Sequence, residues 1–358
     1  MKKTILAVAI ASLSSTAMAV ELYNNDGTTF AVGGHVSVNL NGSEQGDTGV
    51  GSNSPRINFT ATQDLGNGFT ADARGEWQLN YLNGGDNSFT TRLGYVGLTH
   101  EDFGRAVAGT QWAPYYDVAG VADMPIAFAN DFIYDNHGVF GTGRGENMIS
   151  YRNGVELGEA GALDFGFAWQ GQQSDELQNI GAVNFEYDVK DRVQATASYS
   201  IMGAKLGYAY NTGEIKNATF GKGDATSHVV SAAYGSYGKG LYLAGVYASN
   251  ENMNSVGRAG TVKSSRLLEE STAYEFLAAY ALPNSLNFSI NYEMVEGKQF
   301  KAASTKETTR EEMALQVEYN FKPNFVGYTA YQFDLNDKPQ NVKVDTNDMW
   351  VIGARIYL

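Results

Sequence analysis

The last ten residues, 349–358, constrain the fold of this chain more than any other segment. Apolar side chains occupy every second position up to the final residue: Trp350, Ile352, Ala354, Ile356 and Leu358. Successive side chains of a strand point to opposite faces, so this segment predicts a strand with one apolar face. An apolar edge strand promotes aggregation in a soluble protein, whereas a closed membrane barrel pairs its last strand with its first. The segment therefore favours an all-β fold, a transmembrane antiparallel β-barrel.

The first nineteen residues have the layout of a cleavable secretory signal. Lys2 and Lys3 precede the apolar run 5–13, and Ala17-Met18-Ala19 follows it. A membrane-spanning helix needs ~20 apolar residues, which makes an uncleaved anchor the weaker alternative. We expect residues 1–19 to be removed and residues 20–358 to form a single barrel domain.

Composition excludes several classes of protein. The 358 residues contain no Cys, so the chain has neither disulfides nor thiolate sites. The formal net charge of −14 becomes −16 once Lys2 and Lys3 are removed, which excludes a nucleic-acid partner. Gly is frequent (41) and Pro scarce (6), which suits long antiparallel strands.

Period-two alternation recurs along the chain, and several strands carry charged residues on one face. In 69–79, the alternate positions hold Asp72, Arg74 and Glu76. Charged side chains cannot face a dry core without a large cost, so we expect them to face a water-filled lumen. A large soluble sandwich or β-helix is the alternative, but its inward face would have to be the apolar one.

Sixteen segments have this strand pattern, and an even number is typical of single-chain bacterial barrels. They are 30–42, 54–64, 68–82, 89–100, 103–112, 146–154, 162–171, 192–200, 203–212, 227–237, 240–251, 272–282, 286–298, 310–321, 325–337 and 348–358. The segment 180–189 is ambiguous, and we assign it to a loop. The connection 113–143 is too long and too apolar for a solvated loop, so we expect this third loop to fold into the lumen and narrow it.

No pattern in the chain predicts catalysis. The four His residues are scattered with no pair at metal-ligand spacing, and no Gly-x-Ser-x-Gly motif stands out. We expect no catalytic residues, no metal, no cofactor and no enzymatic activity. Two alternatives stay open: an adhesin or receptor barrel whose long loops bind ligands, and an outer-membrane hydrolase barrel.

Several short blocks follow one another in the first 155 residues: Tyr23-Asn24-Asn25-Asp26-Gly27, 63–68, Glu76-Trp77, 91–98, Gly104-Arg105, Tyr116-Asp117, Asp123-Met124-Pro125 and Tyr151-Arg152-Asn153. Taken in this order, they resemble the general porins of Gram-negative bacteria, with the character of the acidic porins of marine vibrios. The resemblance implies a homotrimer of sixteen-stranded barrels in the outer membrane, surrounded by its lipid and lipopolysaccharide. Each barrel would be a passive channel for small hydrophilic solutes and ions.

The resemblance also implies where the channel is narrowest. A ladder of arginines, Arg56, Arg92 and Arg144, would face the loop acid Asp123. Glu76 matches a lumen carboxylate of the family, and His35 stands where the family usually has Lys. Two departures alter the pattern: Ile126 replaces a second loop acid, and Leu358 replaces the usual terminal Phe.

Charge gives opposing indications of selectivity. The arginine ladder favours anions, whereas the acidic mouths and the lumen carboxylates Asp72, Glu76, Glu293 and Glu318 favour cations. We expect a weak cation preference that fades as salt rises. Apolar residues on both faces of 89–100 are a further reason to expect the trimer.

Overall fold

The computed structural model describes residues 19–82, 88–134, 138–173, 177–179, 184–217, 221–254, 267–299, 306–336 and 346–358. All of the expected signal peptide except Ala19 lies outside these residues, and so does most of the short connection 83–88.

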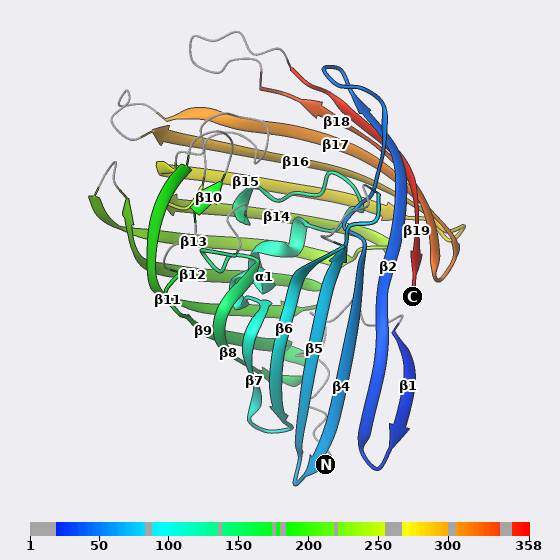
Figure 1. Ribbon diagram of the computed structural model, residues 1–358, viewed down its shortest axis with the longest axis vertical. Helices are drawn as coiled ribbons and strands as arrows, with labels where there is room; N and C mark the ends of the chain where they lie inside the picture. The colour runs from blue at the N-terminus through cyan, green and yellow to red at the C-terminus, as the bar shows by residue number, and fades with distance from the viewer. Residues whose placement is uncertain are drawn as a thin grey trace.

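Sixteen long antiparallel strands close into one barrel (Figure 1). They are β2 (Thr28–Ser43), β4 (Arg56–Gly66), β5 (Phe69–Leu79), β6 (Phe89–His100), β7 (Gly104–Trp112), β8 (Arg144–Glu156), β9 (Ala162–Gln170), β11 (Asn184–Ile201), β12 (Ala204–Asn217), β13 (Gly221–Ser236), β14 (Lys239–Glu251), β15 (Leu268–Ala281), β16 (Leu286–Gln299), β17 (Glu307–Lys322), β18 (Phe325–Asp334) and β19 (Met349–Tyr357). Three short strands add to them: β1 (Val20–Asn25), β3 (Gly49–Gly51) and β10 (Leu177–Asn179). The prediction of a sixteen-stranded barrel is confirmed.

One assignment from the sequence is wrong. Residues 184–189, which we assigned to a loop, form the beginning of β11. They continue the ladder with β12, where Tyr187, Asp188 and Val189 pair with 215–217. Pairing with a neighbouring strand, which a local pattern cannot reveal, makes this segment a strand. Residues 180–183 lie outside the described residues.

Both ends of the chain pair with the same strand, β2. The first half of β2 pairs with β1, where Val20 stands opposite Val32, and the second half pairs with β19, where Tyr357 stands opposite His35. β1 and β19 therefore follow one another along one side of β2 and close the barrel together (Figure 1). At the junction Gly34 has φ +125°, and a Cβ there would lie 2.1 Å from the carbonyl oxygen of Arg56. The strand can turn here because the residue is glycine.

On most strands the outward face of the wall is apolar, and the inward face is polar except where the third loop packs against it. On β2, Val36, Val38 and Leu40 are 37–46% exposed, whereas Ser37 and Asn39 are 1% and 4% exposed. On β5, Arg74 and Glu76 are buried on the inward face, as the alternation predicts. Because the outward face is apolar and the inward face polar, the barrel is built for lipid outside and water inside.

The third loop folds inside the barrel, which confirms the expectation for 113–143 in its described residues. It contains the helix α1 (Pro114–Ala119) and the 3₁₀ turns η2 (Gly120–Ala122) and η3 (Phe132–Tyr134). Figure 1 shows α1 within the barrel, and its residues contact β11, β12 and β13. Among the described residues, no helix is long and apolar enough to cross a membrane.

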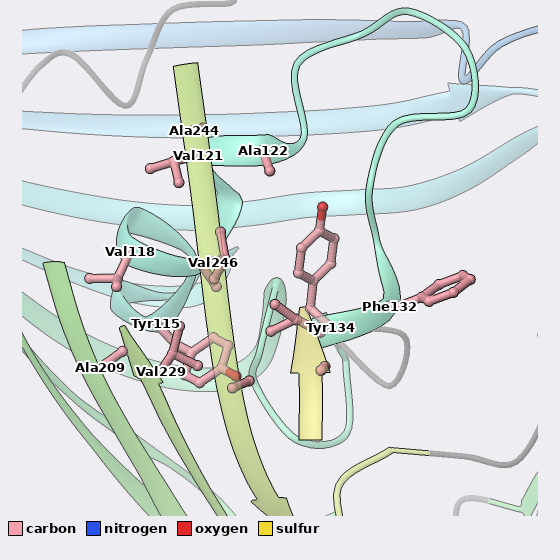
Figure 2. Close-up of a cluster of buried hydrophobic side chains, with 14 of the residues drawn as sticks. Tyr115, Val118, Val121, Ala122, Phe132, Tyr134, Ala209, Val229, Ala244 and Val246 are labelled. Atoms are coloured by element: carbon pink, nitrogen blue, oxygen red, sulfur yellow. The ribbon is translucent and has the colours of Figure 1, made fainter. Parts of the chain in front are cut away.

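A cluster of buried apolar side chains holds the loop against the wall (Figure 2). Tyr115 and Val118 of α1 pack beside Ala209 of β12 and Val229 of β13. Small wall residues leave room for the larger loop residues, so the loop lies close to these strands. The largest apolar cluster of this protein is therefore an interface between the loop and the barrel wall, and a smaller one joins Ala127 to β18 and β19.

Candidate functional site at the lumen constriction

A cavity of about 680 Å³ lies between the third loop and the opposite wall. Its lining comprises Ser52, Asn53, Ser54, Arg56, Arg92, Trp112, Tyr116, Asp123, Met124, Pro125, Ile126, Ala127, Phe128, Ala129, Asp131, Tyr134, Gly143, Arg144, Arg310 and Arg355. The cavity brings together the four residues that the sequence assigned to the constriction, Arg56, Arg92, Arg144 and Asp123. Five arginines and two aspartates border it, so positive charge dominates.

Glu76 organises the arginines on the wall. Its carboxylate lies 2.9 Å from Arg92 Nε, 2.8 Å from Arg74 Nη2 and 3.7 Å from Arg56 Nη1. The Glu76 side chain is only 2% exposed, and it does not border the cavity. A carboxylate surrounded by three cations fixes their positions and leaves the group positively charged. Glu76 lies on the lumen face, where the sequence placed it. The charged groups that contact it are arginines of the protein itself.

Arg92 reaches the cavity because β6 is bulged at that position. In the ladder between β5 and β6, Glu76 pairs with Leu93 and Trp77 pairs with Thr91, so Arg92 has no opposite residue. A β-bulge redirects a side chain, and here Arg92 and its neighbour Leu93 are both buried. Strict alternation would have pointed one of the two outward.

The remaining arginines come from distant parts of the chain. Arg144, the first residue of β8, has its guanidinium 6.0 Å from the centre of the Trp112 ring. Arg355 of β19 donates from Nη2 to the carbonyl oxygen of Asn53, and Arg310 of β17 lies over the Phe132 ring at 4.2 Å. No sequence pattern marked Arg310 or Asp131 as constriction residues, and Arg355 was expected only as part of the terminal strand 349–358.

Asp123 presents its carboxylate from the loop. Tyr116 donates a hydrogen bond of 2.5 Å from its hydroxyl to Asp123 Oδ2. Burial raises the pKa of Asp123 to about 6, and the charge of Asp131 adds to this shift, while the hydrogen bond from Tyr116 opposes it. The same burial, together with the Asp123 charge, raises the pKa of Tyr116 well above its usual value, so the phenol stays protonated.

Two wall carboxylates hold the backbone of the loop near η3. Glu293 accepts from the backbone N–H groups of Asp131 and Phe132 at 2.8 and 3.1 Å, and Glu275 accepts from Ile133 at 3.1 Å. Asn254 donates to the Phe132 carbonyl at 2.5 Å. Hydrogen bonds from the backbone N–H groups of three successive residues hold this turn against β15 and β16.

Wall amides hold the rest of the loop. Gln316 accepts from the N–H of Ala127, and Asn291 donates to the carbonyl of Phe128, both with distances below 3 Å. On the return limb the carbonyls of 138, 140 and 141 accept from Gln170, Asn211 and Gln194. The limb that leads into Arg144 is therefore attached to β9, β11 and β12.

Three further residues that the sequence placed in the lumen lie away from the cavity lining. Asp72 forms a two-point ion pair with Arg105, at 2.6 and 2.8 Å. Arg74 is buried beside Glu76. His35 is 6% exposed and lies edge-on to the Tyr357 ring. Within the described part of the chain, no group of three or more His, Cys, Asp or Glu side chains could hold a metal ion.

The matching protein family and the proteins of similar sequence agree with each other. A sequence model of the family described as "Gram-negative porin" matches residues 6–339. Outer membrane protein S2 of Salmonella typhi is 26% identical over 99% of both chains, and outer membrane protein U of Vibrio parahaemolyticus is also 26% identical over 99% of both. Both are named as outer membrane proteins, which agrees with the polarity of the barrel wall.

Solved structures share the fold. The structure of OmpF of Salmonella typhi in complex with daunomycin superposes with a TM-score of 0.78 at 23% identity, covering 95% of this chain and 100% of that one. OmpT of Vibrio cholerae superposes with a TM-score of 0.67 at 16% identity, covering 95% and 100%. A closed barrel with a polar lumen, narrowed by an inward loop, thus agrees with a family match across most of the sequence. The chain belongs to the Gram-negative porin family and is an outer-membrane porin, through which small hydrophilic solutes and ions diffuse passively.

Proposed function

We propose that the arginines around the constriction give this porin a preference for anions. The observation that carries the proposal is the lining of the cavity, where five arginines meet only Asp123 and Asp131. Opposed unit charges in a narrow pore of intermediate dielectric constant interact by about 1–4 kcal/mol. The resulting transverse field orients dipolar solutes and acts on every ion that passes.

The weak cation preference expected from the sequence depended on free lumen carboxylates. Those carboxylates have protein partners: Asp72 pairs with Arg105, Glu76 with three arginines, and Glu293 with backbone N–H groups. Glu318 accepts a hydrogen bond from Tyr237 at 2.6 Å. Asp72 and Glu76 are compensated by arginines, and Glu293 and Glu318 are only 2% and 7% exposed, so the arginines that border the cavity have the larger effect on passing ions.

The reversal potential in a KCl gradient tests this proposal. The acidic mouths attract cations at low salt, but their charge is screened beyond a Debye length of about 8 Å at physiological ionic strength. The arginines act at contact distance and are screened less. We expect the anion preference to grow as salt rises from 0.1 M to 1 M. Cation preference throughout that range would overturn the proposal.

We infer that the porin assembles as a homotrimer in the outer-membrane lipid and lipopolysaccharide. One of the similar structures is described as the trimer form of OmpT of Vibrio cholerae. The strand β6 is apolar on both faces, with Leu93 buried inside and Val96 62% exposed outside. An outward apolar surface of this kind suits either lipid or a second subunit.

The absence of enzymatic activity and the removal of residues 1–19 stay predictions. Assays of ester and peptide cleavage by the pure protein test the first. The mass of the mature protein tests the second. Binding of host ligands by the outer loops, with the pore incidental, is tested by deleting those loops while following conductance and binding separately.

A further inference from the structure

The cavity at the constriction has an aromatic wall beside its arginines. The Trp112 and Tyr116 rings stack with their centroids 4.3 Å apart, and the Tyr116 and Tyr134 rings meet edge to face at 5.3 Å. All three side chains border the cavity. This wall does not stabilise bound chloride or phosphate, because those ions have no apolar surface to bury. A solute that gains from it needs a flat apolar face.

The aromatic wall and the arginines lie within the span of one small solute. The Arg144 guanidinium lies 6.0 Å from the centre of the Trp112 ring, and Arg56 and Arg355 border the same cavity. The planar guanidinium matches a carboxylate with two parallel hydrogen bonds. At about 680 Å³ the cavity falls within the range of about 300–1,000 Å³ typical of small-molecule sites.

We propose that the constriction selects solutes in which a carboxylate is carried on a ring, the chemistry shared by hexuronic acids and aromatic carboxylates. Because the Trp112 and Tyr116 rings stack on each other, the solute ring packs against the parts of these two side chains that border the cavity, while the carboxylate meets Arg144 and its neighbours. This proposal rests on the anion-preferring constriction proposed above and adds a preference for shape. A ring acid occupies the constriction longer than an open-chain acid of equal charge.

Single-channel currents of the intact protein in planar bilayers test the proposal with matched solutes. D-Glucuronate has the charge of D-gluconate and the closed ring of D-glucose, and benzoate against acetate forms a second matched pair. A pair of aromatic rings contributes about 0.5–1.5 kcal/mol, so we expect benzoate to halve the conductance at up to about tenfold lower concentration than acetate. Glucuronate should differ from gluconate in the same direction. Glucose has the ring without the charge and should have little effect.

The two pairs of solutes distinguish whether the site accepts a sugar ring, an aromatic ring or both. Reduction of the current by both glucuronate and benzoate supports a general ring carboxylate site, and an effect of only one of them identifies which ring the wall accepts. Equal effects within both pairs, glucuronate with gluconate and benzoate with acetate, overturn the proposal. Equal effects of glucose and glucuronate overturn it as well, because the carboxylate is then not recognised.

A pair of tryptophan variants localises the effect. Trp112→Leu should remove the difference between glucuronate and gluconate. Trp169→Leu, which removes an outward-facing side chain that is 45% exposed, should keep it. If Trp112→Leu does not assemble, Tyr116→Leu serves the same purpose, and the solute comparison on the unaltered protein decides by itself. A channel that prefers anions without distinguishing these solutes retains the arginine constriction and loses only the aromatic selectivity, whereas a channel without anion preference overturns the constriction itself.

Discussion

Single residues at the constriction both hold the wall together and act on passing ions. Glu76 illustrates this, because its buried carboxylate contacts Arg56, Arg74 and Arg92 at once. Removing one partner of a buried ion pair leaves an uncompensated charge, which costs more than the pair itself contributed. The positions of Arg56 and Arg92 therefore depend on a residue that no solute touches.

The substitution Glu76→Gln should destabilise the barrel and strengthen its anion preference. It leaves three neighbouring cations without their shared carboxylate, at a cost of about 3–5 kcal/mol. We expect a lower temperature for the heat-induced shift on gels and a reversal potential displaced toward anions. Adding Arg74→Gln should recover part of the lost stability, and Glu159→Gln in an exposed turn is the matched control. An unchanged transition temperature would contradict this role of Glu76.

Acidification should make the channel prefer anions more strongly through Asp123. Its raised pKa of about 6 means that the carboxyl group is charged at pH 7.5 and largely neutral at pH 5. The groups that face it are Tyr116, Tyr134, Asp131 and Arg56. Both tyrosines have pKa values raised well above their usual range, so neither phenol titrates in this interval.

The measurement is the reversal potential between pH 7.5 and pH 5. Asp123→Asn should already show the low-pH selectivity at pH 7.5 and should lose most of the pH dependence. Persistence of the full shift in Asp123→Asn would assign it to other groups.

The sequence predicted the constriction residues in part, and the omissions have physical reasons. The family pattern pointed to four residues, and the cavity is bordered by all of them: Arg56, Arg92, Arg144 and Asp123. Arg310 was missed because a lumen-facing charge on a strand has the same sequence pattern at any height in the barrel, and Asp131 was missed because it lies in the loop, where no alternation marks the lumen-facing side chains. Whether such a charge borders the narrowest point of the channel depends on the position of the third loop inside the barrel.

At the scale of elements, the third loop is the part that converts a wide barrel into a selective channel. Its fold is imposed by the wall, since carboxylates and amides of β9, β11, β12, β15, β16 and β17 bind its backbone. Backbone groups of a buried loop need such partners, because water is excluded from them. The sequence predicted that the loop enters the lumen from its length and apolar content. Its partners could not be predicted, because they lie more than 100 residues away along the chain for most of the loop.

Deleting residues 125–130 should raise the single-channel conductance and admit larger neutral sugars. Five of these residues line the cavity, so their removal widens its loop side. Conductance in KCl and the swelling of liposomes in sugars of increasing size measure the change. A deletion of 45–48, which does not border the cavity, is the control. If the channel without residues 125–130 has the same conductance as the native channel, another segment forms the narrowest point.

At the scale of the whole molecule, charge is distributed by position along the channel. The chain carries a formal net charge of −14, yet the cavity at its constriction is bordered mainly by arginines. The net charge can be counted directly from the sequence, but it describes the charge at the mouths and in the loops better than the charge at the constriction. The strand pattern, by contrast, predicted the barrel well, because lipid outside and water inside impose the same alternation on every strand.

The trimer prediction can be tested by enlarging one outward side chain. Val96 on β6 and Val230 on β13 are 62% and 53% exposed on the outer wall. Lipid accommodates a larger apolar side chain, whereas a packed subunit interface does not. We expect Val96→Trp to lower the temperature at which unheated trimers dissociate on gels and Val230→Trp to leave it unchanged. Cross-linking that yields only monomers would overturn the trimer.

The pairing of both chain ends with β2 determines when this barrel can become a ring. Neighbouring hairpins form from local contacts, but the β2–β19 ladder joins residues more than 300 positions apart, such as His35 and Tyr357. Contacts of such long range form slowly, because the entropy of closing the loop is lost before any contact compensates it. Until the last nine-residue strand arrives, β2 and β18 each expose an unpaired edge. We therefore expect ring closure to come late in folding, and a chain interrupted before residue 349 to remain an open sheet however well its other strands have paired.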